Sequence, residues 1–158
     1  MNANEKNFLH RTEAWAQEEI GAQRRLLEIL DDQREAIVRG DAPALDETGK
    51  RLERELSGGG DRERRRKECL SAFARTWNVA SQGLTLVSIC ERIGVEAERL
   101  LALREELRRT VAQVIKRGRQ IAAIARYHRG LMDDVMQILL GDVSAEGDRR
   151  GALVDAEA

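Results

Sequence analysis

The sequence predicts an all-α fold, an elongated antiparallel helical bundle with two long helices and shorter middle helices. Charged residues make up 35% and hydrophobic residues 42% of the 158 residues, a balance typical of long amphipathic helices. The chain contains one proline and only 3% aromatic residues, a composition that excludes an all-β sandwich or barrel. In two long segments, apolar residues recur every three or four positions, as they do along one face of a helix.

The first long helix is predicted over residues 4–39. Gly40, which can adopt the left-handed conformation, is expected to end it, and Asp41 is expected to cap the next helix, with Pro43 in its first turn. The apolar positions of this first helix include Phe8, Leu9, Trp15, Ala16, Ile20, Leu26, Leu27, Leu30 and Ile37.

The middle of the chain predicts three shorter helices. One covers residues 42–56 and stops at the stretch 57–60, Ser-Gly-Gly-Gly, which we interpret as a flexible hinge. The next covers residues 61–76, and a brief helix over residues 85–93 is expected to end at Gly94.

The last long helix carries the longest apolar stripe in the sequence, a pattern typical of the seam of a bundle or coiled coil. We therefore expect one helical domain over residues 1–140. The segment 141–158 loses the helical period and is predicted to be a mobile tail. The stripe consists of Leu100, Leu103, Leu107, Val111, Val114, Gly118, Ile121, Ala125, His128, Met132, Val135 and Leu139.

The helix lengths lead to a prediction about binding. At a rise of about 1.5 Å per residue, the two long helices measure roughly 54 Å and 67 Å, too long for a compact domain of this size. They are expected to pair in antiparallel fashion, with the short helices covering only the half that holds residues 26–37. The other half is expected to leave an apolar groove, and such a groove marks a binding site. Its expected residues are Phe8, Leu9, Trp15, Leu131, Met132, Val135, Ile138 and Leu139.

Three segments carry a resemblance to a known family. The stretch LLEILDDQREAIVRGDAPALDETGKRLERELS contains a Gly-Asp break after a Leu-rich helix and a Lys followed by a Leu repeat. The stretches GLTLVSICERIG and LLALREELRRTVAQV follow in order, as a small capping helix and the opening of the last long helix. In their order and spacing, over about residues 20–140, they resemble flagellar export chaperones of the FlgN type. In the first stretch the matching residues are Gly40, Asp41, Leu45, Lys50, Leu52 and Leu56.

The resemblance implies a cytosolic chaperone, monomeric or weakly dimeric, that works without nucleotide or other cofactor. Its implied partners are hook-filament junction proteins, whose C-terminal helical segments it holds before type III export, and the export machinery. By position, the client-binding part of the last helix comprises Ile121, Ile124, Ala125, Leu131, Met132, Val135, Ile138 and Leu139. Phe8, Leu9 and Trp15 form a possible additional part of the groove.

Two other functions fit the same residues. A self-associating coiled-coil scaffold would cover the groove with a second copy. Nucleic-acid binding is suggested by eight Lys or Arg residues in the segment 104–129, but the net charge is −1 and Tyr127 is the only Phe, Trp or Tyr among these cations. We expect this basic face to be solvated; docking to acidic export machinery or to the acidic tail also remains open.

No chemistry-bearing motif emerges from the sequence. His10 and His128 belong to no HExxH pattern, and Cys69 and Cys90 form no CxxC pair, so we expect neither an enzyme nor a metal site. The apolar runs are far shorter than the roughly 20 residues of a membrane-spanning helix, and the first residues show no signal-peptide core. The sequence thus predicts a cytoplasmic protein without membrane insertion.

Overall fold

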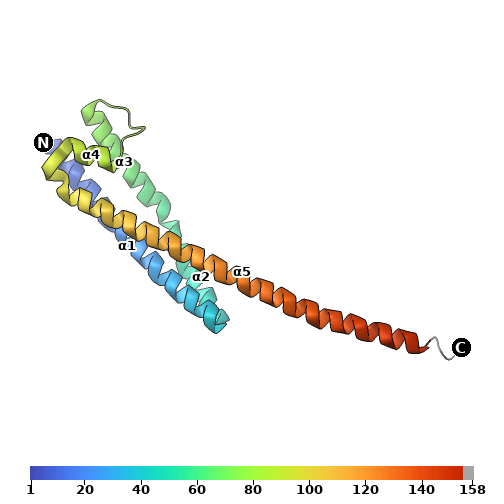
Figure 1. The fold of residues 1–158 in the computed structure, drawn as a ribbon. Helices are drawn as coiled ribbons and strands as arrows, with labels where there is room; N and C mark the ends of the chain where they lie inside the picture. The colour runs from blue at the N-terminus through green and yellow to red at the C-terminus, as the bar shows by residue number, and fades with distance from the viewer. Residues whose placement is uncertain (155–158) are drawn as a thin grey trace. The chain divides into compact units, whose positions relative to one another are not determined.

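The computed structural model describes residues 1–154 of the chain, and side chains up to residue 138. The described residues form helices and no strands, with two long helices and shorter ones between them (Figure 1), so the prediction of an all-α bundle is confirmed. In chain order the elements are α1 (Ala3–Arg39), α2 (Ala42–Ser57), α3 (Gly59–Trp77), α4 (Leu86–Ile93), the 3₁₀ turn η1 (Gly94–Ala97) and α5 (Glu98–Val154).

The ends of α1 are set by local interactions. At the start, the side chain of Asn2 accepts a hydrogen bond from the Glu5 backbone, and the Glu5 carboxylate accepts one from the Asn2 backbone. At the end, Gly40 adopts the left-handed conformation with φ of 66°. The Asp41 side chain then accepts a hydrogen bond from the Ala44 amide and caps α2. The predicted Gly40-Asp41 break is confirmed.

The predicted hinge at residues 57–60 is wrong. Gly59 and Gly60 belong to α3, and Gly58 alone separates it from α2, with φ of −73° and ψ of −10°. A Cβ atom on Gly58 would lie 2.8 Å from a guanidinium nitrogen of Arg62, so a glycine at this position leaves room for that side chain. The glycine therefore serves a close approach between side chain and backbone rather than flexibility.

The chain divides into two compact units, Met1–Arg119 and a second unit that begins at Gln120 within α5. We predicted a single domain over residues 1–140, and this boundary stays a prediction. The backbone of α5 is helical to Val154, beyond the predicted end of the helix. The mobility predicted for residues 141–158 stays a prediction, and residues 155–158 lie outside the described residues.

The core of the first unit joins the start of α1 to α3, α4 and the start of α5. Phe73 lies at its centre, fully buried, with ring centroids 5.8 Å from Phe8 and 4.9 Å from Trp77. The buried residues of this core are Leu9, Trp15, Ala16, Leu70, Phe73, Ile89, Cys90, Ala97 and Leu100.

Within the first unit, α5 runs parallel to α1, opposite to the predicted direction. Arg24 pairs with Glu106 at 2.5 Å and Asp31 with Arg117 at 2.7 Å, so residue numbers increase together along the two helices. The reason is that α2 and α3 follow each other in one direction along α1. Their contacts, from Asp32–Arg51 to Glu5–Trp77, return the chain to the start of α1, where α5 begins. The antiparallel partners of α1 are thus α2 and α3.

Crossing a membrane requires a long, strongly apolar helix, and the part of the chain that the structure describes contains none.

Candidate protein-binding surface

The described side chains of the second unit leave a cluster of large apolar groups exposed on α5, here called the apolar surface of α5. The exposed fractions are 49% for Leu131, 63% for Met132, 42% for Val135 and 65% for Ile138. Single exposed apolar residues are ordinary, but several within two helical turns form a continuous patch. The surface comprises Tyr127, Leu131, Met132, Val135, Met136 and Ile138.

The spacing of these residues places them along one side of the helix. At 100° per residue, Tyr127, Leu131, Val135 and Ile138 fall within an arc of roughly 80°, over a length of roughly 17 Å. Met132 and Met136 widen the stripe on one edge, while the polar residues Arg126, Asp133 and Gln137 lie on the far side. The arrangement is that of an amphipathic helix whose apolar face lies open to a partner.

The structure distinguishes among the residues predicted for this site. The side chains of Ala125, Leu131, Met132, Val135 and Ile138 are exposed, whereas Ile124 is half-buried and Ile121 is buried. The side chain of Leu139 lies outside the described residues. Tyr127 was missing from the prediction. Its position four residues before Leu131 was the available signal.

The predicted contribution of Phe8, Leu9 and Trp15 to an exposed groove requires a correction. Leu9 and Trp15 are buried in the core of the first unit, 3% and 7% exposed, and the half-buried Phe8 packs against Phe73. The indole N–H of Trp15 donates a hydrogen bond of 3.0 Å to the backbone carbonyl of Arg62. These residues are covered because α3 and α4 pack on the first half of α1, the half that we expected to be bare.

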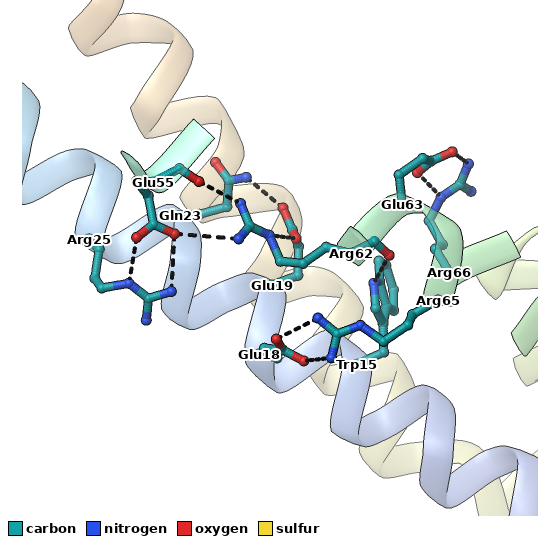
Figure 2. Close-up of polar contacts among 10 residues, drawn as sticks. All are labelled: Trp15, Glu18, Glu19, Gln23, Arg25, Glu55, Arg62, Glu63, Arg65 and Arg66. Atoms are coloured by element: carbon teal, nitrogen blue, oxygen red, sulfur yellow. Dashed lines mark hydrogen bonds and ion pairs between the residues drawn. The ribbon is translucent and has the colours of Figure 1, made fainter. Parts of the chain in front are cut away.

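A group of charged side chains ties α3 to α1 beside Trp15; we call it the α1–α3 ion cluster. Arg62 lies at its centre, 2.9 Å from the Glu19 carboxylate and 3.5 Å from that of Glu55 (Figure 2). Arg25 donates two hydrogen bonds, of 2.9 and 3.1 Å, to Glu55. At the outer edge, Arg65 donates two, of 2.5 and 2.7 Å, to Glu18.

The electrostatics of this cluster favour structure over proton transfer. The two hydrogen bonds from Arg25 lower the pKa of the Glu55 carboxyl, and the same pairing raises the pKa of Arg25. At neutral pH both groups stay charged, whereas a general acid or base needs a pKa near the working pH. The cluster therefore acts as a clamp between helices.

The two cysteines and the histidines also form no recognisable site. Cys69 and Cys90 are buried as free thiols, and burial raises the pKa of the Cys90 thiol, which lowers its reactivity. His128 has an edge contact with the ring of Tyr127. The described residues include no group of three or more His, Cys, Asp or Glu side chains placed to hold a metal ion.

No family model, curated protein or solved structure matches this chain. The resemblance to flagellar export chaperones therefore stays a prediction from the sequence, and the structural observation that bears on binding is the apolar surface of α5.

Proposed function

We propose that this protein is a type III export chaperone of the FlgN type, a cytoplasmic binding protein rather than an enzyme. Its clients would be hook-filament junction proteins, and the apolar surface of α5 would hold their C-terminal helical segments. The observation that carries the proposal is the exposure of Leu131, Met132, Val135 and Ile138 on one helix. The choice of hook-filament junction proteins as clients rests on the sequence resemblance, which is carried by the order of three segments.

Such a function needs a partner that is held but not trapped. Burying a complete aliphatic side chain contributes roughly 1.5–3 kcal/mol, and these side chains, already about half covered, would each contribute roughly half of that. The six side chains of the apolar surface of α5 would together contribute roughly 5–9 kcal/mol, before the entropic costs of binding are subtracted. Ordering a disordered client segment costs about 2–5 kcal/mol, and association entropy costs more. The small surplus suits a complex that must dissociate before export.

The chemistry of the surface also suits a helical client. A segment that polymerises through its own apolar stripe must have that stripe covered to stay unassembled, and a helix with matching three- and four-residue spacing covers it. Met132 and Met136 are unbranched and polarizable, so they can adapt to more than one client sequence.

Titration calorimetry with the C-terminal helical segment of a hook-filament junction protein tests the proposal. We expect Val135→Asp to weaken binding by about 2 kcal/mol, roughly thirtyfold, because a partner would have to bury the new charge. Gln137→Asp, on the far side of the same turn, is the matched control and should leave the affinity within twofold. Circular dichroism should show equal helicity in both variants. Equal affinities of the two variants, or no binding of the segment by the wild type, would contradict the proposal.

The self-associating scaffold makes a different prediction for the same surface. In that case the protein alone would be a stable dimer at low concentration, and Val135→Asp would dissociate it. Light scattering across a dilution series separates the two functions, since the chaperone is expected to remain a monomer or weak dimer. Filter binding at two salt concentrations tests for nucleic-acid binding, which would weaken steeply with salt.

A further inference from the structure

A second open apolar surface lies in the first unit, where α4, η1 and the start of α5 meet. A groove of about 480 Å³ opens there. Its apolar lining includes Val87, Cys90, Val95 and Leu101, and Glu91 and Glu98 also line it. We call it the corner groove. All its residues belong to the first unit, so it is separate from the apolar surface of α5.

The apolar residues of the corner groove are not needed to close the core. Val95 is 87% exposed and Leu101 is 44% exposed. Their neighbours Ile89, Ala97 and Leu100 are buried and supply the packing at this corner. The backbone places Val95 in the 3₁₀ turn η1, which begins at Gly94, the residue that ends α4 with φ of 76°. A preformed site with exposed aliphatic groups costs little ordering entropy on binding.

The groove also has an unbalanced charge. Glu91 and Glu98 are exposed, and neither forms an ion pair within the part of the chain that the structure describes. The cations nearest in sequence have other contacts. Arg92 lies over the ring of Trp77 at 4.6 Å, and Arg99 lies 3.8 Å from Glu13. A third cation, Arg104, pairs with Glu105. The groove therefore combines aliphatic side chains with two uncompensated negative charges.

We propose that the corner groove binds a helical segment of another protein that presents one or two aliphatic side chains flanked by lysine or arginine. The lining residues Val87 and Glu91 on α4, and Glu98 and Leu101 on α5, are spaced four and three apart, so two helical ridges border the groove. A third helix can insert its own ridge between them, with the aliphatic groups against Val95 and Leu101. Its cations would then face Glu91 and Glu98, so the groove would select segments that carry positive charge.

Two designed peptides serve as probes. Both are amphipathic helices with the same leucine positions, one with lysine and the other with glutamate at the flanking positions. Amide NMR spectra of the full chain are expected to change around α4, η1 and the first turns of α5 on addition of the lysine peptide. The glutamate peptide should bind at least tenfold more weakly. Binding of neither peptide, equal binding of both, or shifts confined to other parts of the chain would overturn the proposal.

Matched variants locate the binding on the groove. Val95→Ser should weaken the binding of the lysine peptide at least fivefold. Val38→Ser, at another exposed valine of the first unit, should leave its binding unchanged. Because Val95 is so exposed, its replacement does not disturb the core. Equal effects of the two serine variants would overturn the proposal.

Charge variants test the second half of the proposal. Glu91→Gln combined with Glu98→Gln should weaken the binding of the lysine peptide at least fivefold at low salt. High salt should reduce the difference in affinity between this double variant and the wild type. Glu53→Gln, at an exposed carboxylate on α2, is the control. No effect of the double variant would overturn the proposal. If the protein alone forms a dimer that Val95→Ser dissociates, the occupant is a second copy, and the proposed partner is wrong. Val135→Asp should not alter peptide binding, so this inference and the proposed chaperone function can fail independently.

Discussion

Replacing Arg62 by methionine tests whether the α1–α3 ion cluster fastens the first unit. The Arg62 side chain is only 11% exposed and lies within 3.5 Å of two carboxylates, those of Glu19 and Glu55. Methionine keeps most of the apolar stem of arginine but removes the charge that compensates both carboxylates. Removing one partner of a fully buried ion pair costs about 3–5 kcal/mol.

Two features reduce that cost here. Glu55 retains its two hydrogen bonds from Arg25, and both carboxylates keep some contact with water. We therefore expect Arg62→Met to lower the free energy of unfolding by about 2–3 kcal/mol. Urea unfolding followed by circular dichroism measures this difference, and an unchanged slope would show that the same surface unfolds.

Arg65→Met is the matched control, because it removes the same charge from the same helix. The pair of Arg65 and Glu18 is nearly half exposed on both sides, and such pairs contribute about 0–1 kcal/mol. If Arg62→Met lowers the free energy of unfolding no more than Arg65→Met does, the burial argument is wrong, and the cluster does not contribute measurably to stability.

Three further predictions concern the stability of the first unit. The pKa of Glu55 is lowered in the folded protein, so its carboxylate contributes stability at pH values above the ordinary carboxyl pKa, and this stability is lost as the pH falls through the folded pKa. Urea unfolding at a series of pH values should therefore show a smaller loss of stability in acid for Glu55→Gln than for the wild type. Glu53→Gln is the control and should not show this change. Phe73→Ala should cost about 3–5 kcal/mol in the same assay, and a loss below 1 kcal/mol would contradict its central place in the core. Gly40→Ala should cost about 1 kcal/mol because of its positive φ, although no atom crowds the new methyl group; unchanged thermal stability would refute this.

The sequence predicted the features that depend on neighbouring residues. Gly40 ends α1 and Asp41 caps α2 because their conformation and hydrogen bonds involve groups only a few positions away. The brief helix predicted over residues 85–93 likewise forms as α4, where the Thr85 side chain accepts a hydrogen bond from the Ser88 amide and caps the helix. The apolar face of α5 around Leu131 and Val135 could also be predicted, since helical spacing alone places these side chains on one side of the helix.

Other features were beyond the sequence because they depend on residues far apart in the chain. The Ser-Gly-Gly-Gly stretch has the composition of a hinge, yet Arg62 packs against Gly58 and pairs with Glu19, and the chain stays helical. The corner groove escaped prediction for the same reason, since Val87 and Leu101 come to line one surface only after α4 and η1 turn the chain.

By itself, the sequence determined that the chain is helical, where most helices begin and end, and which side of each helix is apolar. It did so because caps and amphipathic periods are local properties. The tertiary structure alone decided that α5 runs parallel to α1 in the first unit, and that α3 and α4 cover Leu9 and Trp15. An apolar stripe requires cover but does not specify which helix provides it, and here the ion pairs and core contacts between distant residues made that choice.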